Sequence, residues 1–212
     1  TGPLRNRSSL IEGYCSETSL FPGESLDIFL SADPVAEVTI DFYRMGYYSG
    51  NGGRHVHQIP NLAVSPQPTP EPGPNRLREC QWKPTLKFTV PSDWMSGVYL
   101  GKLSCREHRY QSYIIFIVRD RRKAGILFQC SDNTWQAYNR WPDDYSLYTD
   151  PRHAWAPQVA VSFDRPYGKY AQIYDNPQSI GSGEWLCFEF PMAYWLEQEG
   201  YDVTYCSNSD MI

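Results

Sequence analysis

The sequence lacks several features that mark common functional classes. It has no apolar run near the ~18 residues that a membrane-spanning helix needs. Its net charge of −5 gives no basic excess for gripping a phosphate backbone. No P-loop, G-x-G-x-x-G or G-x-S-x-G motif occurs, so nucleotide binding and serine-hydrolase chemistry are not expected. The composition therefore argues against membrane and nucleic-acid partners.

Cysteine is also sparse. None of the cysteines lies in a C-x-x-C motif, so a zinc knuckle or a thioredoxin-type site is not expected. Cys130 has no glycine-flanked elbow, which argues against a thiol nucleophile. We expect buried free thiols, with a disulfide as the alternative, for Cys15, Cys80, Cys105, Cys130, Cys187 and Cys206.

Apolar residues are plentiful, at 41 % of 212 residues, which is enough for a packed core. Up to about residue 120, apolar and polar residues alternate in short segments separated by turns, as in half-buried strands. Segments 25–30 and 37–43 alternate in this way, and 85–90, 97–103 and 112–118 are further predicted strands. The pattern predicts an antiparallel, immunoglobulin-like β-sandwich over residues 1–120.

Two histidines stand one residue apart within this region. His55 and His57 lie on a predicted strand, so both side chains are expected on the same face. Such a pair can bind a metal ion, but no third ligand is evident nearby. An ordinary surface pair is the alternative.

The pattern changes after residue 120. Residues 123–130 form a continuous apolar segment, typical of a strand in a parallel sheet that is covered on both faces. Residues 131–183 show no sustained periodicity and are rich in aromatic residues, which is typical of a long functional loop.

A helix and a second strand follow. Apolar residues recur at helical spacing over 184–199, Gly200 ends the pattern, and Pro191 predicts a kink or two short helices. Residues 201–206 form the strand. Strand, helix and strand together predict one parallel unit.

One such unit leaves open sheet edges and uncovered faces. We therefore expect residues 121–212 to be the N-terminal part of an α/β catalytic domain that polypeptide outside this chain completes. That polypeptide is expected to be a separate subunit or the other half of a cleaved precursor. The alternative is that the sandwich covers the parallel strands unaided.

Four segments resemble motifs of one protein family. Residues 44–54 (RMGYYSGNGGR) resemble its R-x-G-Y-Y-x-G-x-G-G-R loop, and residues 90–99 (VPSDWMSGVY) resemble its V-P-x-D-W-x-S-G-x-Y segment. Residues 134–139 (TWQAYN) and 161–167 (VSFDRPY) match two further motifs. The sequence thus resembles the large (beta) subunit of N,N-dimethylformamidase and its relatives.

The resemblance implies an immunoglobulin-like domain followed by the first part of a glutamine-amidotransferase-like (flavodoxin-like) α/β domain. It also implies hydrolysis of a small amide at a mononuclear iron, Fe³⁺, held by a Tyr, a His and a Glu. Tyr138 of the TWQAYN motif corresponds to the Tyr ligand. The family's His and Glu come from a His-Asp-Glu-Tyr-Trp segment that this sequence lacks. The resemblance therefore implies a second polypeptide or C-terminal fragment that supplies them.

Tyr138 is also notable for its position. It follows the 123–130 strand by about eight residues, at the carboxyl end of the sheet, where open α/β folds bind ligands. A phenol with a pKa near ~10 ionises at neutral pH only beside a strong Lewis acid. The alternative is a buried tyrosine with a hydrogen-bonded hydroxyl.

Polar residues near Tyr138 are further candidates. Asp132 and Asn139 are predicted to be catalytic, by orienting a metal-bound water or the amide. The alternative for both is turn chemistry after a strand. His153 is a further candidate, either as a metal ligand or as a residue that contacts a ligand.

Aromatic residues and one arginine are the candidates for substrate binding. Trp135 and Trp141, with Tyr145, are predicted to wall a pocket for a small dialkyl amide, and ordinary packing is the alternative. Arg165 is predicted to hold a carboxylate, and an ion pair with Asp164 is the alternative.

Two functions besides an iron-dependent amidase stay open. One is a non-catalytic binding module whose aromatic surface grips a sugar or a partner protein. The other is an amidotransferase-like scaffold without chemistry.

Overall fold

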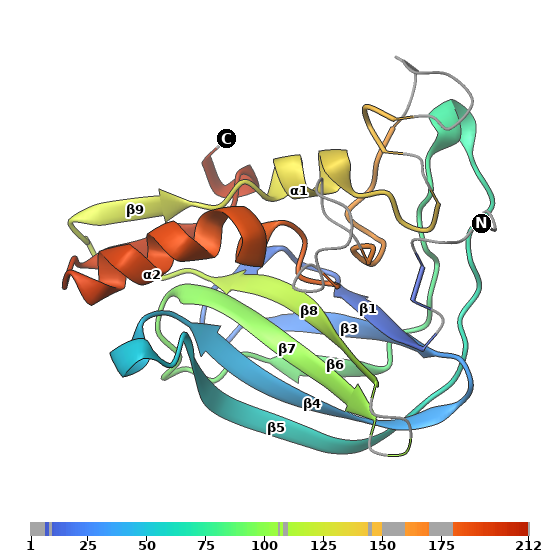
Figure 1. Cartoon of the computed structure of the whole chain (residues 1–212), viewed down its shortest axis with the longest axis horizontal. Coiled ribbons are helices and arrows are strands. Elements are labelled where there is room, and N and C mark those ends of the chain that lie inside the picture. Colours follow the sequence, from blue (N-terminus) through green and yellow to red (C-terminus); the bar gives the residue numbers. More distant parts are fainter. Residues whose placement is uncertain are drawn as a thin grey trace.

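The computed structural model describes residues 7–8, 10–105, 107, 110–143, 146–149, 160–169 and 180–211. Two β-sheets lie face to face, and a smaller layer of strands and helices lies against one of them (Figure 1). The architecture is mixed α/β with strands predominating, as the sequence predicts.

The larger sheet has five strands in the order β2-β8-β7-β4-β5. β2 pairs with β8 in parallel, and the other pairs are antiparallel. Every second residue of β4 is buried, which is the alternation expected of a strand with one face on a core. The bounds are β2 (Ser19–Leu20), β4 (Ala36–Met45), β5 (Gly53–Val64), β7 (Gly97–Cys105) and β8 (Tyr110–Val118).

The smaller sheet has three antiparallel strands in the order β1-β3-β6. Their bounds are β1 (Ile11–Cys15), β3 (Ser25–Ala32) and β6 (Leu86–Thr89). Apolar side chains of both sheets meet in a first core, which includes Ile28, Ile40 and Phe116. The strands predicted between residues 25 and 118 are confirmed within a few residues, whereas β1 and β2 were not predicted.

The C-terminal part contains the predicted parallel pair, β9 (Ile126–Gln129) and β10 (Val203–Cys206). The predicted helix consists of a π-helical turn (Trp185–Glu189) followed by α2 (Phe190–Gln198). Pro191 lies in the first turn of α2, where its missing N–H costs nothing, so it begins a helix rather than kinking one.

A further short helix, α1 (Asp132–Tyr138), lies in the segment that was predicted to be a loop. That prediction is therefore wrong for these residues. The described chain also has 3₁₀ turns at Tyr48–Gly50, Pro74–Arg76 and Ser209–Met211.

A second core joins the C-terminal part to the outer face of the five-stranded sheet. Val98 and Ile117 of β7 and β8 pack there with Trp185, Leu196 and Tyr205. The middle of the large sheet is thus covered on both faces, by the small sheet on one side and by β10 and α2 on the other.

Glu197 of α2 forms a polar link across this interface. Its carboxylate accepts hydrogen bonds from Arg44 Nη2 at 2.9 Å, from the Tyr47 backbone N–H at 3.2 Å and from the Tyr205 hydroxyl at 3.1 Å. A Cβ on Gly46 would overlap the carboxylate, with Cδ of Glu197 only 2.9 Å away. The R-x-G-Y-Y motif therefore builds the junction between the two parts of the chain.

The outer side of the parallel pair is exposed. Leu127 of β9 is 53 % exposed, and Met192 and Trp195 of α2 are 53 % and 47 % exposed. Phe188 of the π-helical turn is also exposed. The expectation that the 123–130 strand is covered on both faces is wrong for the described residues, because none of their elements packs on this side.

The two histidines of β5 do not face the same way, which corrects the prediction. A β-bulge shifts the register, so His57 pairs with Phe42 and His55 pairs with Tyr43. The His57 ring lies near Phe42, whereas His55 Nε2 lies 3.0 Å from Asp41. Successive β4 residues point to opposite faces, so the imidazoles diverge.

All six cysteines are thiols, which confirms the expectation. Five are buried, and Cys187 is partly exposed. None of the helices in the described part of the chain has the length and apolar character needed to cross a bilayer.

Candidate functional site

Tyr138 lies beyond the carboxyl end of the parallel strands. β9 ends at Gln129, and α1 then runs from Asp132 to Tyr138 (Figure 1). No side-chain hydrogen bond caps this helix at Ser131. Trp135 is buried in the second core, and this packing stabilises a helix that is too short to be stable alone.

A small pocket lies beside Tyr138. Its lining comes from three segments: Trp135, Tyr138 and Asn139; Tyr167 and Gly168; and Gly183 and Glu184. The volume is about 10 Å³, which is room for about one water molecule. Tyr138 is half-buried, and its ring centroid lies 4.9 Å from that of Tyr148. The described residues thus place a water-sized space beside Tyr138 and the buried residue Glu184.

Asn139, a predicted catalytic residue, is buried and uses its whole side chain within the chain. Nδ2 donates to Gln136 Oε1 at 3.1 Å and to the Pro166 carbonyl at 2.9 Å. Oδ1 accepts from the backbone N–H groups of Trp141 at 3.1 Å and Gly168 at 2.9 Å. The side chain therefore fixes the turn that follows α1, and its catalytic role stays a prediction.

Arg165, predicted to bind substrate, is only 2 % exposed. Its Nη1 donates to the Trp141 carbonyl at 2.9 Å, and its Nη2 donates to the carbonyls of Gln136 and Asn139, both at 3.2 Å. The predicted alternative, an ion pair with Asp164, does not form between these two described residues. Burial lowers the pKa of Arg165 to about 10, which keeps the guanidinium charged at neutral pH.

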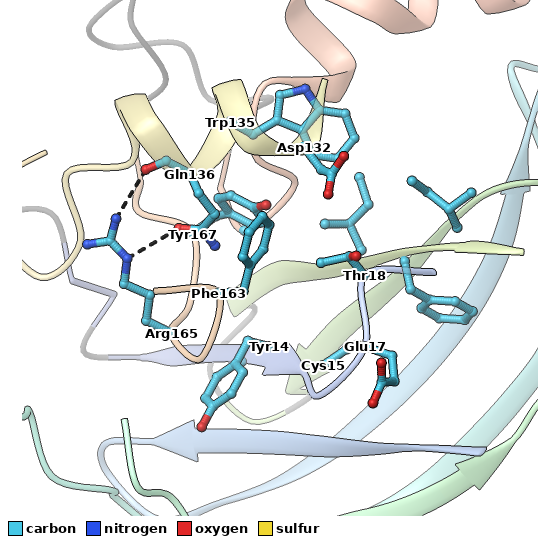
Figure 2. A pocket seen from close by; sticks show the side chains of 15 residues that line it. Tyr14, Cys15, Glu17, Thr18, Asp132, Trp135, Gln136, Phe163, Arg165 and Tyr167 are labelled. Carbon is cyan, nitrogen blue, oxygen red and sulfur yellow. Dashed lines mark hydrogen bonds between the residues drawn. The ribbon is translucent and has the colours of Figure 1, made fainter. Parts of the chain in front are cut away.

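Asp132, the other predicted catalytic residue, opens into a neighbouring cavity of about 30 Å³. Figure 2 shows its carboxylate pointing from α1 toward Thr18. Oδ1 accepts from the Asn208 N–H at 2.6 Å, whereas Oδ2 is buried without a partner among the described residues. Burial raises the pKa of Asp132. Because a buried polar atom without a partner is costly, this cavity is suited to ordered water.

The two predicted substrate-binding tryptophans lie in different places. Trp135 lines both the Tyr138 pocket and the Asp132 cavity. Trp141 is fully buried in a third cluster, and its indole N–H donates to Glu12 Oε2 at 2.9 Å. The structure therefore brings Trp135 beside Tyr138 but not Trp141.

Two glutamates near α1 were not predicted, Glu184, which is buried, and Glu189, which is partly buried. Glu184 lines the Tyr138 pocket, and Glu189 accepts hydrogen bonds from Trp135 Nε1 at 2.8 Å and from the Ser131 N–H at 3.1 Å. Burial raises the pKa of Glu189. The one sequence signal that could have found them is two acidic residues within the otherwise apolar segment 184–190.

No group of three His, Cys, Asp or Glu side chains that could hold a metal ion occurs among the described residues. Tyr145 and His153, which were predicted near the site, lie outside the described residues.

Comparison with known families supports the resemblance in the sequence. The family model described as "N,N-dimethylformamidase beta subunit-like, C-terminal" matches residues 39–212. Since the match covers most of the chain, the chain belongs to this family. A comparison with curated proteins finds no match.

Proposed function

We propose that this chain, as a member of the dimethylformamidase beta subunit-like family, is part of an amidohydrolase that cleaves a small C–N amide bond. The observation that carries the proposal is the position of Tyr138. This half-buried residue lies past the carboxyl end of β9 and lines a pocket together with Glu184. Open α/β folds bind ligands at this end of their strands.

We further propose that Tyr138 is a ligand of a mononuclear ferric ion. The fit rests on Tyr138 alone, whose phenol is an oxygen donor of the kind that ferric iron accepts and which lines a pocket past the end of β9. When bound, such an ion would supply a Lewis acid that polarises the amide carbonyl. The missing His and Glu ligands are proposed to come from a second polypeptide.

The remaining candidates have distinct proposed roles. Trp135 is proposed to border the substrate-binding region, because it lines the Tyr138 pocket. Asp132 opens into the adjacent cavity, which shares Trp135 and Tyr167 with that pocket, so we propose that it acts through ordered water.

The second polypeptide is proposed to cover the outer side of the parallel pair. Leu127, Phe188, Met192 and Trp195 leave large apolar side chains about half exposed there. Large apolar side chains that are left exposed in this way are typical of an interaction site. Replacing Trp195 with Glu is expected to weaken the assembly, which analytical ultracentrifugation would measure.

The finer fold assignment is also a proposal. An immunoglobulin-like sandwich is supported by two facing sheets whose first strands divide between them, β1 in one and β2 in the other. The start of a glutamine-amidotransferase-like domain is supported by the parallel β9-β10 pair with α1 and α2 between its strands.

Iron measurement tests the proposed function. The assembly with its partner polypeptide is expected to hold iron, and Tyr138→Phe is expected to lose both the iron and hydrolysis of N,N-dimethylformamide. Tyr148→Phe is the matched control, because its ring packs on Tyr138 but does not line the pocket. Retention of iron and activity by Tyr138→Phe would rule out the ligand assignment. Equal iron in the isolated chain and in the assembly would rule out a shared site.

One observation favours the alternative of a binding module. A groove of about 340 Å³ lies between the glycine-rich turn after β4 and the start of α2, with Tyr43, Tyr113 and Phe190 in its lining. Its volume is typical of small-molecule sites, unlike that of the Tyr138 pocket. Binding of a glucose oligomer that Tyr113→Ala abolishes and Tyr138→Phe leaves intact would favour this function.

A further inference from the structure

Two of the sequence motifs contact each other at the C-terminal end of α1. The TWQAYN motif forms the helix and its C-terminal turn, and the VSFDRPY motif passes beside that turn. Figure 2 shows the Arg165 guanidinium reaching Gln136 from below the helix. Arg165 lies 26 residues after Asn139 in sequence, so only tertiary packing brings the two motifs together.

Arg165 is the centre of this contact. Besides its bonds to three backbone carbonyls, its Nε lies 3.2 Å from both Gln136 Oε1 and the Ser162 carbonyl. No carboxylate forms an ion pair with it among the described side chains. Each of the three nitrogen atoms of this buried guanidinium therefore meets an oxygen atom of the chain, so the group is engaged in holding the backbone. The planar guanidinium holds two backbone carbonyls that precede and follow Tyr138 in sequence, those of Gln136 and Asn139.

Asn139 adds a second set of contacts from within the turn after α1. We call the contacts of Arg165 and Asn139 together the frame of Tyr138. Its amide ties the end of α1 to Pro166 and Gly168, the residues on either side of Tyr167. All of its hydrogen-bonding positions are used within the chain. The backbone on each side of Tyr138 is therefore fixed by side chains rather than by helix geometry alone.

We propose that Arg165 and Asn139 are positioning residues that set the orientation of the Tyr138 phenol. This assignment differs from the roles predicted from the sequence, substrate binding and catalysis. It rests on the proposed function only for the importance of Tyr138, and the frame itself can be tested without iron.

The test places 3-fluorotyrosine in the full chain and follows Tyr138 by ¹⁹F NMR, with its signal assigned by Tyr138→Phe. Arg165→Lys keeps the positive charge but loses the guanidinium that bonds several carbonyls at once. The ¹⁹F signal of Tyr138 is therefore expected to move by more than its linewidth. Arg44→Lys is the matched control, since Arg44 is also buried but bonds Ser96 and Glu197, away from α1. The control is expected to leave the signal in place. In the iron-loaded assembly, Arg165→Lys is expected to lower kcat about tenfold with little change in KM.

Gln136→Met provides a milder variant, which is used if Arg165→Lys does not fold. It removes the one side-chain oxygen that both Arg165 and Asn139 contact. An unmoved Tyr138 signal in the folded variant, or an equal shift in Arg44→Lys, would overturn the proposal. A raised KM with an unmoved signal would also overturn it, in favour of substrate binding. Iron retained by Tyr138→Phe refutes the metal proposal alone, because the ¹⁹F shift still reports the frame.

Discussion

Replacing Gly46 with alanine tests whether the junction between the sandwich and α2 depends on a close approach. Gly46 is not among the glycines with positive φ, so the cost arises from contact rather than from backbone strain. The added methyl group would displace the Glu197 carboxylate, which lies against this glycine. The consequence is the loss of the hydrogen bonds from Arg44, Tyr47 and Tyr205.

The magnitude follows from the burial of the pair. The side chains of Arg44 and Glu197 are 9 % and 17 % exposed. Breaking such a pair leaves a guanidinium largely buried without its counter-ion, at a cost of about 3 kcal/mol in the free energy of unfolding. For a chain of this size, that corresponds to a Tm lower by roughly 6–12 °C. Glu197→Ala is expected to cost about the same.

The double variant supplies the decisive comparison. In Glu197→Ala the carboxylate is gone, so adding Gly46→Ala should cost little more, and the two changes should be far from additive. Urea unfolding followed by tryptophan fluorescence measures all three variants, with the exposed Glu199→Ala as a control that should stay near wild type. Additive losses, or a Gly46→Ala variant as stable as the wild type, would refute the reasoning.

Two further predictions concern buried groups. Burial raises the pKa of Glu12 from 4.5 to about 7, so between these pH values the native chain holds a proton that the unfolded chain has released. The free energy of unfolding should therefore fall as pH rises across this range, by up to about 1.4 kcal/mol per pH unit, and Glu12→Gln should flatten this slope in urea titrations. A wild-type slope equal to that of Glu12→Gln would contradict the assignment. A maleimide reagent should modify Cys187 first, because the other five thiols are buried, and peptide mass mapping that finds Cys130 labelled as early would be inconsistent with this burial.

Much of the fold could be predicted because alternation reports a half-buried strand directly. β3 and β4 carry that signal, whereas β7 and β8 are largely buried on both faces and are recognisable as short apolar segments between turns. The parallel β9-β10 pair follows from its apolar strands and intervening helix. β1 was missed because Glu12 and Gly13 interrupt its apolar character, yet both are buried. α1 was missed because its stability comes from Trp135 in the second core rather than from a repeating apolar face.

The site could be predicted only in part. The position of Tyr138 follows from its distance along the chain from β9, which is a local property. Glu184 and Glu189 reach the same region from more than 40 residues away, and no local pattern encodes that approach. The hydrogen bond from Arg165 to the Asn139 carbonyl was missed for the same reason. A spacing in sequence does not reveal which oxygen atoms a buried guanidinium will contact.

The second core also has a consequence for how the molecule is made. Val98 and Ile117 belong to strands of the larger sheet, and Trp185 and Tyr205 of the C-terminal part pack against them. The apolar side chains of the C-terminal part therefore have no surface to pack against until the five-stranded sheet has formed. We expect vectorial folding during synthesis, with the sandwich acting as a template, and we expect that residues 121–212 grafted onto an unrelated scaffold would not fold.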